Sequence, residues 1–309
     1  NLTLAGSGIK TLTGVTVNST LSMEGTSTVS AAPTYGAAAA LQYNTATSRI
    51  AGTEWINNFA ATGGVIISNT GTITLSANRT FTATAPLTVN SGATLSMSTF
   101  TLALNGNFIN NGGTASGTGT VTIAGTAPQN IGSFTTTGLV SITKTGGTAT
   151  LTGNVFGGAF TLSGNGGTLN LGAALTHTFT GTWTRTNGIL NGGSSALRIS
   201  GATSGTGGAF SAGTGTVEYF AAGPQTIASV LYNNLILTGS GTKTFASSVI
   251  IGGDLSINTG VVADLGTSLT HTSATLNLGG ILQVAGTWGS SSSAASNTND
   301  TFFTLTNGI

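Results

Sequence analysis

The sequence predicts an all-β fold, and specifically a right-handed parallel β-solenoid, in which short strands stack turn upon turn. Three observations predict it: a long internal repeat, short segments in which apolar and polar residues alternate, and frequent glycine-containing turns between them. The alternative is a row of immunoglobulin-like β-sandwiches, one to each repeat. Sandwich strands are longer than these segments and rely on aromatic core residues, which make up only 6% of this chain.

The internal repeat is roughly 95 residues long. Gly117–Val121 returns unchanged at 213–217, and Pro128–Ile131 returns with one substitution at 224–227. Self-similarity at a fixed period is typical of folds in which each unit packs only on its neighbours. A repeat of this kind indicates an extended surface rather than a single pocket.

The short sequence motifs of the repeat occur throughout the chain. We therefore expect one continuous solenoid over residues 1–309, with the repeat clearest in 117–212 and 213–309. The pattern is already present at Asn1, and neither an initiator Met nor a signal peptide precedes it. We expect the chain to be a segment of a longer protein.

Each expected strand combines Leu, Ile, Val, Phe or Met with alternating Thr, Ser, Asn or Ala, as a half-buried strand requires. In chain order, the clearest are Leu2–Leu4, Val15–Val17, Leu21–Met23, Ile73–Leu75, Leu87–Val89, Leu95–Met97, Phe100–Leu104, Val121–Ile123, Leu169–Leu171, Leu255–Ile257, Leu276–Leu278 and Ile281–Val284. Gly-Gly, Asn-Gly and Ser-Gly turns separate them, because glycine supplies the positive φ of tight corners.

Residues 24–59 depart from this pattern because aromatic and charged residues gather there. We expect an inserted or wider loop packed on the flank of the solenoid, where binding residues of rigid scaffolds are often found. Exposed aromatic rings there would stack on sugars, and charged groups would orient them. The candidate ligand-binding residues are Tyr35, Tyr43, Arg49, Glu54 and Trp55.

The scarcity of charge limits the chemistry that the chain can perform. It has six acids and seven bases, a net charge of +1 and no cysteine. Hydrolysis of a glycan requires two carboxyl groups close together. Only Glu24 and Glu54, with Arg49, offer such a group through the expected loop. We assign no catalytic residue, and a secreted polysaccharide-active β-helix enzyme is the alternative function.

Cofactor, metal, nucleic-acid and membrane roles receive no support from the sequence. The two histidines, His177 and His271, stand in equivalent Leu-Thr-His-Thr sequences nearly one repeat apart, with no acid or cysteine at ligand spacing. Lys and Arg are scattered singly, whereas nucleic-acid binding requires clusters. No apolar run is long enough to insert into a membrane. We expect structural roles for both histidines and no cofactor.

A run of alternating threonines raises a further alternative, ice binding by a flat array of hydroxyl and methyl groups. An extended segment would place on one face Thr176, Thr178, Thr180, Thr182, Thr184 and Thr186. Ice-binding solenoids repeat Thr-x-Thr in every turn, and the spacing here is irregular. The β-propensity of threonine explains most of the pattern.

Several short sequences resemble those of a known family. They are Pro33–Gly36, Leu41–Asn44, Gly52–Trp55, Gly63–Ile67, Pro224–Ile227, Tyr232–Leu235 and Gly239–Thr244. This series is similar to repeats in very large surface proteins of Bacteroidetes, the SprB-like adhesins and gliding-motility proteins that the type IX secretion system exports. The resemblance implies an extracellular or cell-surface location and a role in attachment. It supplies no catalytic residues, and the C-terminal sorting domain of the family is not visible.

Together these observations predict an extracellular structural stalk or adhesin segment of a bacterial surface or secreted protein, without catalysis. The expected partners are surface glycans or other extracellular surfaces, and the secretion machinery during export. Uncharged strands at open edges pair with one another, so we also expect lateral or end-to-end self-association.

Overall fold

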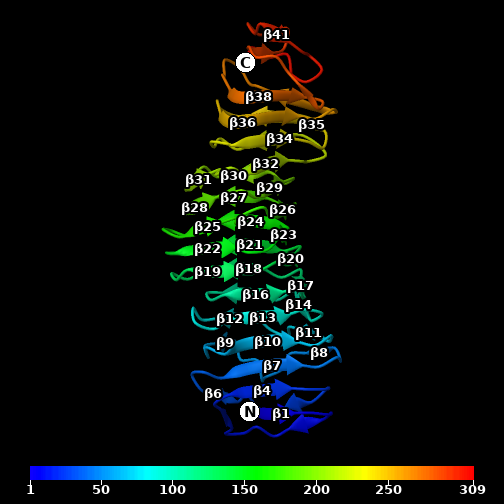
Figure 1. The fold of residues 1–309 in the computed structure, drawn as a ribbon, viewed down its shortest axis with the longest axis vertical. Helices are drawn as coiled ribbons and strands as arrows, with labels where there is room; N and C mark the ends of the chain where they lie inside the picture. Colours follow the sequence, from blue (N-terminus) through cyan, green and yellow to red (C-terminus); the bar gives the residue numbers. More distant parts are fainter. The chain divides into compact units, whose positions relative to one another are not determined.

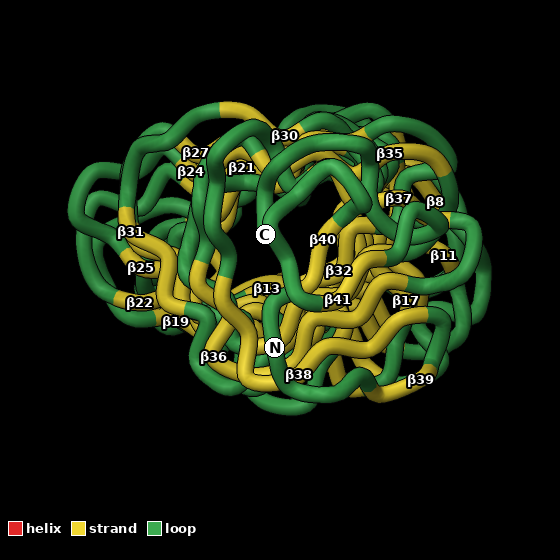
Figure 2. Tube along the Cα trace, turned by 90° about the horizontal axis from the view of Figure 1, so that it is seen from above, coloured by secondary structure: helices red, strands yellow, loops and turns green.

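The computed structural model describes residues 1–309 and consists of strands, turns and loops. Figure 2 shows no helix at any point of the chain, so no helix is present that could span a membrane. The strands stack in about 14 turns of a parallel β-solenoid, which confirms the predicted fold class over the sandwich alternative. The chain forms two compact units: unit 1 holds residues 1–157 and 163–169, and unit 2 holds 158–162 and 170–309.

Unit 1 has three walls of parallel strands, one strand from each turn, and its successive turns are visible in the blue to green part of Figure 1. Wall A contains β1 (Leu2–Leu4), β4 (Thr20–Met23), β7 (Ala40–Asn44), β10 (Gly64–Ser68), β13 (Leu87–Asn90), β16 (Phe108–Asn111), β19 (Gln129–Ile131) and β22 (Thr148–Leu151). Wall B contains β8 (Arg49–Ile50), β11 (Thr72–Thr74), β14 (Thr94–Ser98), β17 (Thr114–Gly117), β20 (Phe134–Thr136) and β23 (Val155–Gly157). Wall C contains β9 (Asn58–Phe59), β12 (Arg79–Phe81), β15 (Leu102–Leu104), β18 (Val121–Ile123) and β21 (Leu139–Ile142). The first turns add the pairs β2 (Ile9–Lys10) with β5 (Thr28–Val29) and β3 (Thr16–Val17) with β6 (Thr34–Tyr35).

Unit 2 has one long wall, here called the main wall, and several shorter sheets. The main wall contains β26 (Thr176–Phe179), β29 (Ala196–Ile199), β32 (Thr216–Tyr219), β34 (Asn234–Leu237), β36 (Ile250–Ile257) and β38 (Thr272–Leu278), followed by the antiparallel β39 (Ile281–Leu282). The shorter sheets are β24 (Ala159–Leu162) with β27 (Trp183–Arg185) and β30 (Thr203–Ser204), β28 (Ile189–Asn191) with β31 (Ala209–Ser211), β33 (Gln225–Ile227) with β35 (Gly241–Phe245) and β37 (Val261–Asp264), and β40 (Trp288–Gly289) with β41 (Asn297–Thr298). One further strand, β25 (Thr168–Asn170), lies at the boundary between the two units.

The alternation in the sequence sets which side chains enter the core. In β14 the side chains of Leu95 and Met97 are fully buried, while Thr94 and Ser96 face outward. Val65 pairs with Leu87, and Leu87 pairs with Phe108, so consecutive turns take 22 and 21 residues here. Like side chains therefore stack on like, and each turn buries its apolar face on the turns beside it.

Glycine is required where one turn closes tightly on the next. Gly193 has a φ of +59°, and a Cβ there would lie 1.9 Å from the carbonyl oxygen of Gly172 in the preceding turn. Any other residue would combine a strained backbone with a steric clash. The predicted role of glycine in the corners is therefore confirmed at this position.

Residues 24–59 form turns of the solenoid instead of an inserted loop. They include β5 to β9, and in β7 the residues Leu41 and Tyr43 pair with Leu21 and Met23 of the preceding turn. The cause lies in the aromatic residues themselves. Tyr43, Trp55 and Phe59 have large apolar rings whose burial stabilises the interior, so the segment winds around them.

The alternating threonines do not share one face. Thr176 and Thr178 lie on β26 of the main wall, whereas Thr184 lies on β27 in a different sheet. A corner at residues 180–182 separates the two strands. The alternation itself is as expected, because the opposite residues His177, Phe179, Trp183 and Arg185 are all buried. The single flat array that ice binding would need is absent from this segment.

Candidate functional site

The structure brings the five predicted site residues together, but inside unit 1. Tyr43 and Glu54 are fully buried, Trp55 is 1% exposed and Arg49 is 9% exposed. Only Tyr35, on β6, is partly exposed, and its hydroxyl donates a hydrogen bond to the backbone oxygen of Glu54 at 2.7 Å. The rings of Tyr43 and Trp55 are therefore in the core, where they present no open face to a sugar.

Glu54 is the centre of this buried cluster. Its Oε1 accepts hydrogen bonds from the Tyr43 hydroxyl at 2.9 Å and from the Gly52 amide at 2.9 Å, and it lies 3.5 Å from Nη2 of Arg49. The same Arg49 nitrogen donates to the backbone oxygen of Ser27 in an earlier turn. The carboxylate and guanidinium thus tie together backbone from separate turns, as buried ion pairs must when they leave water.

Aromatic rings and cations surround the ion pair. The guanidinium of Arg49 lies 5.4 Å from the centroid of the Tyr43 ring, and that of Arg79 lies 5.8 Å from the Trp55 ring. The Tyr43 and Trp55 rings are 5.8 Å apart. Such contacts place each positive charge over an electron-rich ring in a low-dielectric interior. The cluster closes the core instead of opening a cleft.

The electrostatics of the cluster keep its phenols protonated. Burial, reinforced by the negative charge of Glu54, raises the pKa of Tyr35 and of Tyr43 well above the ordinary value. Burial also lowers the pKa of Arg79. Both phenols therefore stay protonated near neutral pH. The carboxylate of Glu54 that they surround is fully buried.

Glu24 does not join this cluster. It is partly exposed, and its Oε1 accepts hydrogen bonds from Ser22 at 3.1 Å and from Asn44 at 3.5 Å. Glu54 is fully buried behind the wall that carries these residues. The two carboxyl groups that the enzyme alternative requires are therefore not arranged as an acid and a base around a common substrate position.

The repeated Pro-Gln sequence positions a buried amide in both units. Gln129 donates from Nε2 to the backbone oxygens of Leu104 and Gly106, at 3.2 and 2.9 Å. Gln225, at the equivalent repeat position, donates to Ile199 and Gly201, both at 3.0 Å. Each glutamine satisfies carbonyl groups of the preceding turn that would otherwise be buried without a partner.

A buried lysine accompanies each glutamine. Nζ of Lys144 donates to the backbone oxygen of Ala127 at 2.8 Å and to Oε1 of Gln129 at 2.9 Å. Nζ of Lys243 donates to Ala221 at 2.8 Å and to Gly223 at 2.9 Å. Burial lowers the pKa of both lysines. The repeat thus encodes cations that hold neighbouring turns together.

The two histidines also have matching structural roles. Nε2 of His177 lies 2.8 Å from the backbone oxygen of Leu171, and Nε2 of His271 lies 3.0 Å from that of Leu265. Burial lowers the pKa of both rings, which favours the neutral form. No group of three or more potential metal ligands lies together anywhere in the chain. Each histidine closes a corner six residues long.

The main wall of unit 2 carries a charged pair on its outer face that the sequence reasoning missed. Nε of Arg198 on β29 donates to Oε2 of Glu218 on β32 at 2.6 Å, and the hydroxyl of Thr238 donates to Oε1 at 2.7 Å. The guanidinium also lies 4.6 Å from the Phe220 ring. The sequence does contain a signal for this pair. Arg198 and Glu218 are residues of opposite charge that stand 20 positions apart, which is one turn of the solenoid here.

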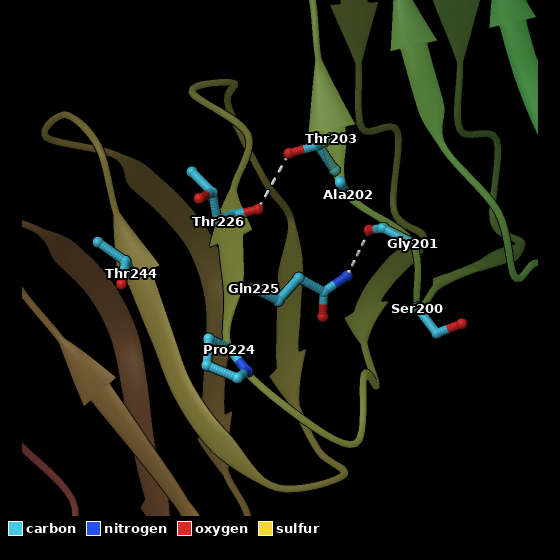
Figure 3. Close-up of a pocket in the computed structure, with 8 residues that line it drawn as sticks. All are labelled: Ser200, Gly201, Ala202, Thr203, Pro224, Gln225, Thr226 and Thr244. Carbon is cyan, nitrogen blue, oxygen red and sulfur yellow. Dashed lines mark hydrogen bonds between the residues drawn. The ribbon is translucent and has the colours of Figure 1, made fainter.

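A polar pocket of about 230 Å³ begins two residues beyond Arg198 (Figure 3). Its lining residues are Ser200, Gly201, Ala202, Thr203, Pro224, Gln225, Thr226 and Thr244. The Thr203 hydroxyl donates to the backbone oxygen of Thr226 at 3.0 Å, so it bridges the end of one short sheet and the start of another. The lining is uncharged and offers hydroxyl groups, which suit a small neutral polar ligand.

Comparison with protein-family models, curated proteins and solved structures finds no match for this chain.

Proposed function

We propose that this chain is an extracellular structural segment, a stalk or adhesin, of a bacterial surface or secreted repeat protein. The observation that carries the proposal is the placement of its reactive side chains. The acid Glu54 and the bases Lys144 and Lys243 are buried inside the solenoid, where their hydrogen bonds and ion pair tie backbone segments together. The two histidines close corners within a turn. The outer faces present mostly short, uncharged side chains in register, which is typical of a scaffold that displays a surface.

Location is the part of this proposal that can be tested most simply. An antibody against the purified chain is applied to intact and to permeabilised cells of the bacterium that produces it. We expect equal labelling of both, or the protein in the culture medium. An antibody against a cytoplasmic enzyme, which should label only permeabilised cells, is the control. Labelling confined to permeabilised cells would remove the stalk and adhesin roles.

The best candidate surface for contact with a neutral glycan lies in unit 2. The hydroxyl-lined pocket at Thr226 begins at Ser200, and the partly exposed Phe220 lies on the neighbouring turn, where its amide donates to the backbone oxygen of Ile199. A sugar uses both hydrogen bonds and stacking on aromatic rings. A glycan array that includes host and bacterial polysaccharides identifies ligands. For any ligand found, Thr226→Val and Phe220→Ala should each weaken binding about tenfold or more, the loss of about 1.4 kcal/mol. Thr122→Val, on wall C of unit 1, is the matched control.

A further inference from the structure

The last long strand of the main wall has a partly open edge. β38 pairs with β36 along its length on one side. On the other side only Asn277 and Leu278 pair with β39, and Leu276 accepts one further bond, from the Gln283 amide at 2.8 Å. Residues 272–275 are exposed and have no strand beside them on that side. An open edge of this kind is a template for another strand.

The orientation of the open backbone groups follows from the alternation along a parallel strand. The amide of Thr272 donates to Val249 in the preceding turn at 3.2 Å. Successive residues direct their backbone groups to opposite sides of a strand, so the amide of Ser273 faces the open side. The edge therefore offers hydrogen-bond donors and acceptors at strand spacing.

A groove lies directly beside this edge. After Gln283 the chain diverges from β38, and residues 272–276 and 282–288 form opposite sides of a groove of about 500 Å³. Its base includes the buried residues Leu255, Leu265 and Phe303. Trp288 lines the far side, where its indole nitrogen donates to the backbone oxygen of Val284 at 3.0 Å. The groove has the volume of a ligand site and an unpaired backbone edge along one side.

The lining determines the chemistry of an occupant. It contains no Lys, Arg, Asp or Glu, and burial lowers the pKa of the one titratable ring, His271. Leu282 and Val284, at the rim, are 64% and 69% exposed. An occupant that paired with the edge would place every second side chain toward the apolar base. It must therefore be extended, uncharged and apolar at alternate positions.

We propose that this groove, between β38 and residues 282–288, binds an extended segment of another polypeptide by strand addition, with alternate apolar side chains directed into the groove. The backbone edge supplies affinity, and the base supplies selection for side chains. A second copy of this chain is not the occupant that the structure favours. Of its own open edges, β1 has Leu4 buried in its core, and residues 272–275 of β38 carry no large apolar side chain for the groove.

The test uses a synthetic peptide and the purified full chain. The probe is an acetylated and amidated nonapeptide in which Val and Thr alternate, and the matched control has the same side chains with every second backbone nitrogen methylated. Trp288 lines the groove, whereas Trp55 and Trp183 are buried elsewhere, so tryptophan fluorescence reports binding. We expect a saturable change with the probe, at least about tenfold weaker binding of the methylated peptide, and no change in Trp288→Phe.

Ser273→Pro removes the edge amide and should weaken binding of the probe by about tenfold or more. Circular dichroism and thermal melting check that this variant is folded, and the methylated peptide keeps the test decisive if it is not. Equal binding of the two peptides, or no binding of either, would overturn the proposal. Concentration-dependent dimers that Ser273→Pro abolishes would also overturn it, since they would identify a second copy as the occupant.

Discussion

Two Arg–Glu pairs, one in each unit, show how the same chemistry is used differently in the interior and on the surface. Arg49 and Glu54 lie in the core of unit 1, with side chains 5% and 1% exposed. Arg198 and Glu218 lie on the outer face of unit 2, with side chains 37% and 18% exposed. The distance between the guanidinium nitrogen and the carboxylate oxygen is 2.6 Å in the surface pair and 3.5 Å in the buried pair. Water nevertheless screens the attraction between the charges far more at the surface. Distance alone is therefore a poor guide to what an ion pair contributes.

The buried pair also leaves polar atoms without partners. Nε and Nη1 of Arg49 and Oε2 of Glu54 have no hydrogen-bond partner, although all three atoms are buried. Desolvation costs free energy at each such atom. Removal of either charge would therefore leave the other one buried without a counter-charge, which is not so for the exposed pair.

The largest effect is expected from breaking the buried pair. Glu54→Gln leaves the guanidinium of Arg49 buried without a counter-charge, and we expect it to destabilise unit 1 by about 3–5 kcal/mol. Denaturant titration followed by hydrogen exchange in each unit measures this change. A loss below about 1 kcal/mol would mean that the pair is in contact with water.

A smaller but clear effect is expected from the buried lysine of unit 1. Lys144→Met keeps most of the side-chain volume but leaves Ala127 and Gln129 without a donor, and we expect a loss of about 2–3 kcal/mol. Lys10→Met is the control, because Lys10 bonds only the Ser7 carbonyl at an exposed site. Equal losses in the two variants would contradict a structural role for the buried cation.

The histidines predict a pH dependence in unit 2. Burial lowers the pKa of His177 and His271 in the folded chain, so the unfolded chain binds more protons as the pH falls below the ordinary value of about 6.5. The stabilisation that comes from keeping both rings neutral is complete above about pH 6.5. It is lost as the pH falls toward the lowered pKa values of the histidines in the folded chain. The denaturant concentration at the midpoint of unfolding should decrease as the pH is lowered from 7.5 to 5. The double variant His177→Gln/His271→Gln should show a flatter profile, and an unchanged slope would contradict the assignment.

The smallest effect is expected from the surface pair. Burial acts to raise the pKa of Glu218, but hydrogen bonds from Arg198 and Thr238 outweigh it and the pKa is lowered overall. Glu218→Gln should cost no more than about 1 kcal/mol, and the cost should shrink in high salt. Thermal melting at low and high salt measures both quantities. A large loss of stability that does not depend on salt would contradict this prediction, because it would mean that the surface pair behaves like the buried pair.

Much of the fold could be predicted from the sequence because one physical rule generates it. Alternation fixes which residues of β14 or β18 face inward, and the repeat fixes where equivalent residues recur. The recurrence of Gln129 and Gln225 in the repeat also has a structural cause. Both side chains donate hydrogen bonds to carbonyl groups of the preceding turn. Residue type alone does not reveal this role, because glutamine is usually a surface residue.

The candidate site was harder to predict for a physical reason. The sequence predicts a site at Tyr43, Glu54 and Trp55 because aromatic and charged residues often gather at binding surfaces. It does not tell which side of a wall these residues occupy. In a solenoid a shift of one residue exchanges interior and exterior. The Arg198–Glu218 pair could have been found by comparing positions 20 residues apart. Turn length varies along the chain, however, from 22 residues between Val65 and Leu87 to 18 between Gln225 and Lys243, and only the structure shows which spacing applies at each place.

The interior of this solenoid uses ionic groups to hold turns together, whereas the ion pair on its outer face adds little to stability. A pair of double-mutant cycles tests it most directly: Arg49→Met with Glu54→Gln, and Arg198→Met with Glu218→Gln, each read in its own unit. We expect a coupling free energy of about 1–3 kcal/mol for the buried pair and at most about 0.5 kcal/mol for the surface pair. Equal couplings in the two cycles would contradict the claim.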